Sequence, residues 1–135
     1  MLQLWRGFFI LMSDMWKRTA VLAMVIGLLL PTFLPAQDET KVPNKPLDLK
    51  ATRRYEGATA VAVLVWRDES DNELGFEVLR ADNNQDYRVV GMVGANTTKY
   101  EDKIGKYITG TFTYKVRAFN QAGKSEDSNV VSAWF

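Results

Sequence analysis

The sequence of 135 residues contains no cysteine and no histidine. Without cysteine, the chain forms no disulfide and has no thiolate to bind a metal or attack a substrate. Without histidine, it lacks the base of every Ser-His and Cys-His catalytic pair. These two absences exclude disulfide-stabilised folds and the commonest kinds of nucleophilic catalysis.

An excess of one charge is also missing. The chain has 17 Lys and Arg side chains and 16 Asp and Glu side chains, which gives a net charge of +1. Domains that bind nucleic acid usually carry a clear positive excess. We therefore expect no nucleic-acid partner.

Residues 19–37 contain no charged side chain at all. Lys17 and Arg18 precede this stretch, and residues 20–30 are apolar without interruption. A basic pair followed by such a run has the order of a secretory signal peptide. Ala36 offers a small residue for cleavage before Gln37. The sequence therefore predicts that residues 1–36 are an N-terminal hydrophobic export helix.

An uncleaved signal anchor is the alternative interpretation of residues 1–36. A helix that spans a membrane needs about 20 apolar residues, so this run is short for a permanent anchor. Met1, Met12 and Met15 are all possible starts of translation.

Residues 37–45 are polar and predict a short linker, after which the pattern becomes that of β-strands. No window of residues 46–135 keeps an apolar period of 3.6 residues, and short β-rich runs recur at the spacing of a sandwich or barrel. The predicted strands are residues 47–51, 60–66, 75–81, 87–93, 97–101, 111–120 and 129–133. Seven such strands predict an all-β fold, a seven-stranded antiparallel immunoglobulin-like β-sandwich.

Alternation along these runs predicts which side chains are buried. Trp66, Phe76 and Tyr114 fall on the core faces of their strands. The opposite face of residues 60–66 carries three valines, which are Val61, Val63 and Val65. High β-propensity explains these valines, or they form part of a contact patch for another domain.

Two runs carry a family resemblance. Residues 64–78 read LVWRDESDNELGFEV, and residues 114–125 read YKVRAFNQAGKS. In this order and spacing they resemble the fibronectin type III domain, in the version common in bacterial secreted proteins. The resemblance spans nearly all of residues 43–135, and we assign the domain to residues 46–135.

The resemblance implies a topology in which strands A, B and E face strands C, C′, F and G. It implies that Trp66 is the core tryptophan of strand B. It also implies that Tyr114 forms a tyrosine corner, with its hydroxyl bonded to the backbone a few residues upstream. The sequence has no Arg-Gly-Asp tripeptide, so integrin-type adhesion has no support.

The loops B–C (residues 67–74) and F–G (residues 121–127) are expected at one end of this sandwich. Loops on a rigid scaffold are frequent sites of recognition. The candidate binding residues in these loops are Asp68, Glu69, Asp71, Asn72, Gln121 and Lys124.

Residues 68–73 are acidic, and hard cations such as calcium take several oxygen ligands. The stretch lacks the glycine and the closing glutamate of a calcium loop at the proper spacing, so we interpret it as a turn. We expect no metal and no cofactor.

Carboxylate pairs also serve glycoside hydrolysis, but a lone sandwich of this size offers no deep cleft to raise the pKa of one of them. The prediction is therefore a protein that is not an enzyme.

Together these observations predict an exported, non-catalytic fibronectin type III module that binds a protein or a cell-surface polymer, or acts as a spacer. We expect it to be secreted, in the periplasm or at the cell surface. The alternatives are a membrane-anchored structural protein and an accessory domain of a larger secreted enzyme. Carbohydrate binding would need a row of exposed aromatic rings, and the candidates, Tyr55, Phe119 and Trp134, fall on different elements.

Overall fold

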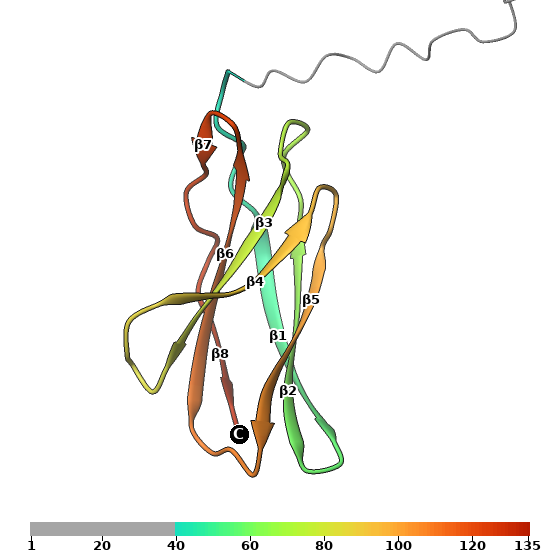
Figure 1. The fold of residues 1–135 in the computed structure, drawn as a ribbon, viewed down its shortest axis with the longest axis vertical. Coiled ribbons are helices and arrows are strands. Elements are labelled where there is room, and N and C mark those ends of the chain that lie inside the picture. Colours follow the sequence, from blue (N-terminus) through green and yellow to red (C-terminus); the bar gives the residue numbers. More distant parts are fainter. Residues whose placement is uncertain (1–39) are drawn as a thin grey trace, which may run out of the picture. The chain divides into compact units, whose positions relative to one another are not determined.

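The computed structural model describes residues 40–135, so the predicted export helix and the first residues of the predicted linker lie outside the described part. The described part contains eight strands and no helix (Figure 1). The strands are β1 (Leu47–Glu56), β2 (Thr59–Arg67), β3 (Gly75–Asp82), β4 (Arg88–Gly94), β5 (Lys99–Lys106), β6 (Thr111–Asn120), β7 (Gly123–Lys124) and β8 (Val131–Trp134).

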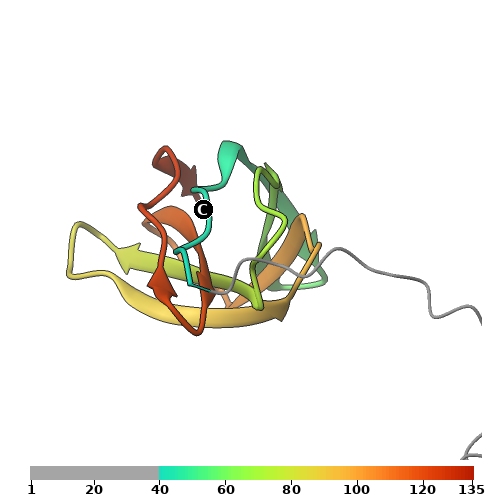
Figure 2. The same ribbon diagram turned by 90° about the horizontal axis from the view of Figure 1, so that it is seen from above.

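The strands form two antiparallel sheets, which Figure 2 shows from above as two layers. One sheet has the order β1-β2-β5, and the other has the order β4-β3-β6, with β7 and β8 both paired to β6. This is the predicted arrangement of A, B and E against C′, C, F and G. The number of strands differs from the predicted seven, because the last strand is divided into β7 and β8.

Two serines explain why the last strand is divided. Between β7 and β8, Ser125 donates its backbone N–H to the carbonyl of Ala118, and its hydroxyl accepts the N–H of Ala118 at 2.9 Å. Ser128 does the same with Val116, whose N–H lies 3.0 Å from the serine Oγ. Buried backbone groups must find partners. Because the hydroxyls take the place of strand carbonyls, β6 stays fully bonded while the segment beside it bends.

Two strands extend further than the sequence pattern predicts. β1 continues to Glu56 instead of residue 51, and β5 continues to Lys106 instead of residue 101. Their added residues are polar on the outer face, where alternation of apolar side chains gives no signal. Cross-strand ion pairs occupy that face instead.

The core lies between the sheets and contains the three predicted core residues. Phe76 and Tyr114 are fully buried, and Trp66 is 3% exposed, with its ring centroid 5.6 Å from that of Phe76. The other buried members of this cluster are Leu49, Ala60, Ala62, Leu64, Val78, Phe112, Val116, Ala118, Ala133 and Phe135.

The three outward valines of β2 do not form one exposed patch. Val65 is 45% exposed, but Val61 is completely buried although it faces away from the core cluster. Its neighbours in register are Arg54 on β1 and Lys103 on β5. Both of these side chains bind Glu56, at 3.0 Å and 2.9 Å, above the sheet. Long charged side chains cover apolar surface with their stems, so this end of the stripe is closed to a partner.

A buried polar network joins the two sheets. Arg80 of β3 places NH1 2.7 Å from Oδ2 of Asp102 on β5, and the hydroxyl of Tyr114 on β6 donates to the same oxygen at 2.9 Å. The expected tyrosine corner is therefore wrong in its acceptor, which is a side chain on the facing sheet and not the nearby backbone. An ionised carboxylate is a stronger acceptor than a backbone carbonyl.

The network predicts unequal costs for removing its members. Asp102→Ala removes two hydrogen bonds to one ionised group, from Arg80, which keeps its bond to Asp82, and from Tyr114, and is expected to lower the free energy of unfolding by about 3–5 kcal/mol. Tyr114→Phe removes one hydrogen bond to a charged group and is expected to cost about 1.5–3 kcal/mol. Urea unfolding measures both values. The control is Lys99→Ala, which removes an exposed ion pair to Glu101 and should cost at most about 1 kcal/mol. Equal costs for Asp102→Ala and Lys99→Ala would contradict the role given to the network.

Candidate functional site

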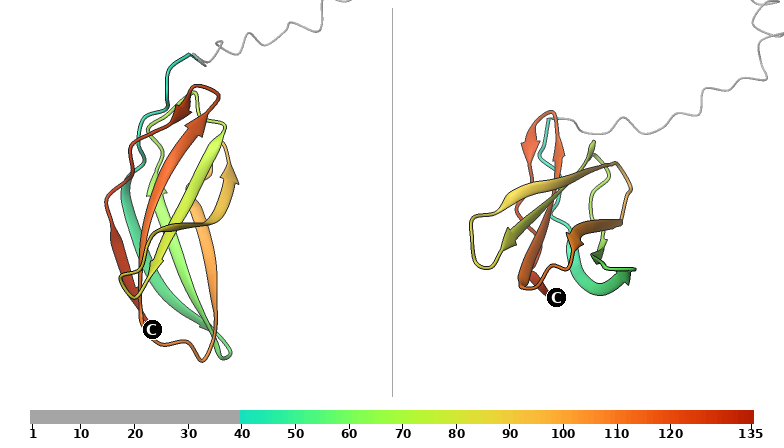
Figure 3. Two further views of the ribbon diagram at one scale, coloured as in Figure 1. Left: turned by 60° about the vertical axis from the view of Figure 1, so that its left-hand side comes forward. Right: turned by 60° about the horizontal axis from the view of Figure 1, so that its bottom comes forward.

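The loop between β2 and β3 and the segment after β6 lie at the same end of the sandwich, next to residues 41–45 (Figures 1 and 3). We call residues 41–45 the strap and this end of the sandwich the N-terminal pole. The side-chain amide of Asn72 donates to the carbonyl of Lys41 at 2.9 Å, and that of Asn120 donates to the same carbonyl at 2.8 Å. Asn120 also donates to the carbonyl of Asn72 at 3.2 Å. Two buried asparagines therefore fix the strap against both loops.

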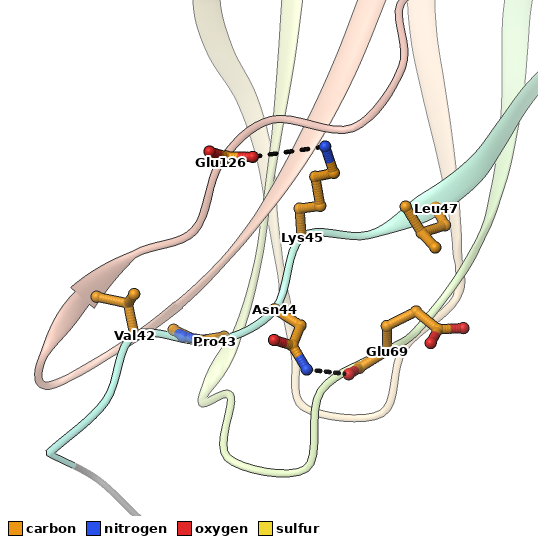
Figure 4. Close-up of a pocket in the computed structure, with 7 residues that line it drawn as sticks. All are labelled: Val42, Pro43, Asn44, Lys45, Leu47, Glu69 and Glu126. Carbon is orange, nitrogen blue, oxygen red and sulfur yellow. Dashed lines mark hydrogen bonds and ion pairs between the residues drawn. The ribbon is translucent and has the colours of Figure 1, made fainter.

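A groove of about 480 Å³ lies at this pole (Figure 4). The side chain of Asn44 donates to the carbonyl of Glu69 at 2.8 Å across it, and Lys45 Nζ lies 3.4 Å from Oε2 of Glu126. The strap, the β2–β3 loop and the segment after β7 thus all contribute to it. The lining residues are Val42, Pro43, Asn44, Lys45, Leu47, Glu69 and Glu126.

A second groove of about 570 Å³ continues from the first, since both are lined by Lys45 and Leu47. It runs between the start of β1 and the segment before β8, where Asn129 bridges to β1. The Asn129 side chain accepts the N–H of Leu49 at 2.9 Å and donates to the carbonyl of Leu49 at 3.0 Å. The two grooves together offer an open, elongated surface.

Four of the six predicted binding residues belong to the β2–β3 loop, and only one of the six lines the first groove. Glu69 lies in the groove, and its carboxylate is held 3.0 Å from NH1 of Arg67. Asp71 is exposed, whereas Asn72 is buried and positions the strap. Asp68 accepts the backbone N–H of Ser70 at 2.9 Å.

The other two predicted binding residues follow β6. Gln121 is exposed in the turn between β6 and β7. Lys124 lies outside the groove, because its Nζ is 2.8 Å from Oε1 of Glu77 on β3. Arg117 donates to the same carboxylate at 2.7 Å. Burial raises the pKa of Glu77, but the hydrogen bonds from Lys124 and Arg117 outweigh burial and hold it below its ordinary value.

The sequence pattern missed the strap, whose residues lay in the predicted linker. Val42, Asn44 and Lys45 form much of the groove. The available signal was the pair of prolines on either side of Asn44 and Lys45. Pro43 and Pro46 are both buried against the domain, and proline favours an extended chain without a backbone donor.

The three aromatic residues considered for carbohydrate binding do not form a row. Phe119 lies at the N-terminal pole, where its carbonyl accepts the N–H of Leu74. Trp134 is 65% exposed and ends β8 at the opposite pole, where its carbonyl accepts a hydrogen bond from Arg53 at 2.7 Å. The ring of Tyr55 packs edge-on against Phe135 at 5.8 Å. A planar aromatic platform made from these three side chains is therefore contradicted.

Residues 40–135 contain no group of three or more acidic, cysteine or histidine residues placed to hold a metal ion. Within the same residues, no helix is long and apolar enough to cross a membrane.

The sequence matches no family profile, and no curated protein sequence matches it significantly. Solved structures do match. A multi-domain titin structure superposes with a TM-score of 0.57 and 20% identity over 70% of this chain, which spans 32% of that one. The sixth fibronectin type III domain of human fibronectin type III domain containing protein 3 gives 0.54 and 21%, covering 68% of this chain and 84% of that one.

A bacterial structure is similar to the same degree. An Fn3-like protein from Clostridium thermocellum superposes with a TM-score of 0.53 and 19% identity, over 68% of this chain and 92% of that one. The described domain therefore has the fibronectin type III fold, as its motifs predict. Function on such a scaffold depends on individual surface residues.

The strap predicts a local effect of two substitutions. Asn72→Ala and Asn120→Ala each remove a hydrogen bond to the carbonyl of Lys41, so the backbone of residues 41–45 should become more mobile, with lower order parameters than in the unchanged protein. Backbone ¹⁵N relaxation at residues 41, 42, 44 and 45 measures this directly. Gln121→Ala, an exposed change one residue away from Asn120, should leave these order parameters unaltered. Unchanged order parameters in both asparagine variants would show that the strap is held by other contacts.

Proposed function

We propose that this chain is an exported, non-catalytic binding module and that its N-terminal pole contacts a protein partner. The observation that supports the proposal is the groove made jointly by the strap and two loops. These segments come from residues far apart in the sequence and are fixed to one another by Asn72 and Asn120.

Rigidity at the pole favours recognition. A binding surface that is already ordered loses less conformational entropy when a partner arrives. The strap is fixed by its own bonds to Glu69, Ser70 and Glu126 and by the two buried asparagine side chains. The two sheets provide the rigid scaffold for these loops.

The groove has the chemistry of a protein-binding surface. Val42 is 43% exposed, and Leu47 offers further apolar surface beside it. Lys45 and Glu126 are exposed and 3.4 Å apart, so their ion pair contributes little to stability and can be exchanged for charges of a partner. A partner segment with an apolar side chain between charged ones fits this pattern.

Cross-linking tests the position of the contact. A photoreactive benzoylphenylalanine replacing Val42 is expected to cross-link a protein in the cells that produce this chain. The added change Lys45→Glu should reduce the yield several-fold, because it places like charge beside Glu126. The matched control carries the same photoreactive residue at Trp134, which is exposed at the opposite pole. Equal cross-linking from both positions, or from Trp134 alone, would contradict the proposed surface.

Export is the second part of the proposal and follows from residues 1–36. The intact mass of the chain should be measured separately in the extracytoplasmic fraction and in membranes. A soluble species beginning at Gln37 is expected. A full-length species confined to membranes would instead make residues 1–36 an anchor and the domain a tethered surface element.

A further inference from the structure

Glu73, at the end of the β2–β3 loop, has a buried carboxylate oxygen that accepts no hydrogen bond from the described part of the chain. The side chain is 2% exposed. Its Oε1 accepts the backbone N–H of Asn96, from the β4–β5 turn, at 2.9 Å. Its Oε2 is also buried and has no hydrogen-bond partner among residues 40–135. Burying an ionised oxygen without a donor is costly, and a proton at this place would remove that cost.

The neighbouring group is another carboxyl. Asp68 lies within hydrogen-bond reach of Glu73. Its Oδ1 already accepts the N–H of Ser70 at 2.9 Å. Each carboxyl group thus has one oxygen that accepts a backbone N–H. Two ionised carboxylates this close repel each other, whereas one proton between them makes a strong O–H···O⁻ bond.

We propose that Asp68 and Glu73 share one proton, and that this proton holds the β2–β3 loop closed. The loop is then a pH-sensitive element of the N-terminal pole. The inference concerns the shape of the loop and does not depend on the identity of any partner.

A proton fits this pair better than a metal ion. Calcium takes six to eight oxygen ligands and magnesium six. The pair supplies two carboxyl groups, each with one oxygen already bonded to a backbone N–H. No third acidic residue in the described part of the chain completes a metal-binding group.

The charged groups around the pair do not neutralise it. On the same loop, Glu69 adds a further negative charge beside Asp68. Arg67 is held by Asp48 at 3.1 Å and by Glu69 at 3.0 Å.

Two lysines on the segments near the loop form ion pairs with other carboxylates and not with Asp68 or Glu73. After the β4–β5 turn, Lys99 binds Glu101 at 2.8 Å, and in the strap Lys45 binds Glu126.

The direction of the pKa shift agrees with this geometry. Burial raises the pKa of Asp68, the hydrogen bond from Ser70 lowers it, and the nearby Glu73 raises it again, with a net shift above the ordinary value. A carboxyl group with a raised pKa stabilises the folded state at low pH and loses that contribution as the pH rises through its folded pKa. The loop should therefore loosen as the pH increases.

The pKa values of two other carboxyl groups, those of Asp82 and Glu77, are shifted in the opposite direction. Burial raises the pKa of Asp82, but hydrogen bonds from Arg80 and Arg88 outweigh it and leave the pKa below its ordinary value. The contribution of Asp82, like that of Glu77, is lost as the pH falls. Acid should weaken the sheets at these positions while it closes the β2–β3 loop.

Opening of the β2–β3 loop would change the shape of the proposed binding surface. Glu69 lines the groove, and Asn72 binds the strap through Lys41. Both residues lie between Asp68 and Glu73 in the chain.

The test combines carboxyl NMR titration with hydrogen exchange on the purified protein from pH 3 to 8. The carboxyl signal of Asp68 is expected to titrate above its ordinary range, in what we call the upper step. Across the upper step, the protection of the Ser70 and Asn96 amides, corrected for intrinsic exchange, should fall.

Glu73→Gln provides the decisive variant. Its side-chain amide supplies a permanent donor to Asp68, so the upper titration step should vanish and protection should no longer depend on pH. If Glu73→Gln fails to fold, Asp68→Asn replaces it in the test, because its side-chain amide supplies a permanent donor to Glu73. The matched control is Asp71→Asn at an exposed position of the same loop, in which the upper step should remain.

Three results would overturn the inference. In the first, Asp68 titrates at its ordinary pKa, and Glu73→Gln does not change that pKa. In the second, amide protection stays constant through the upper step. In the third, added calcium chloride at neutral pH shifts both carboxyl signals and restores protection, which would assign the site to a cation in place of the proton. The cross-linking test at Val42 can succeed or fail independently of each of these.

Discussion

The carboxylate of Asp102 is the constraint on which the arrangement of the two sheets depends. It receives Arg80 and Tyr114 from the five-stranded sheet while it belongs to β5 of the three-stranded one. Apolar packing is tolerant of small shifts, but a buried carboxylate with two short hydrogen bonds is not. The network therefore adds a directional contact between the two sheets to the packing that the hydrophobic core provides.

The sequence was sufficient to predict the fold, because its signals are local. Alternation placed Trp66, Phe76 and Tyr114 on buried faces, and the two motif runs specified the order of the strands. It did not predict that Tyr114 binds Asp102, because no periodicity links side chains on facing sheets. It also assigned too short a β1, because Arg54 and Glu56 are held by ion pairs that no alternation of apolar residues shows.

The candidate site was harder to predict from the sequence, because it also depends on contacts between side chains that lie far apart in the chain. The two loops were expected together, and the structure places them together, but the individual side chains take different roles. Asn72 is buried beneath the strap and Lys124 is bound to Glu77, whereas Glu69 reaches the groove. The strap looked like a linker because it is polar and contains proline. Its place in the domain comes from asparagine side chains far away in the sequence.

The division of the last strand affects the tendency of the domain to self-associate through its sheet edge. An exposed sheet edge invites another strand to pair with it. Here that edge consists of β7, with 2 residues, and β8, with 4 residues. Between them, Ser125 and Ser128 have turned inward to bond β6. An incoming chain would find no continuous ladder along this edge, so the two serines help to protect it from self-association.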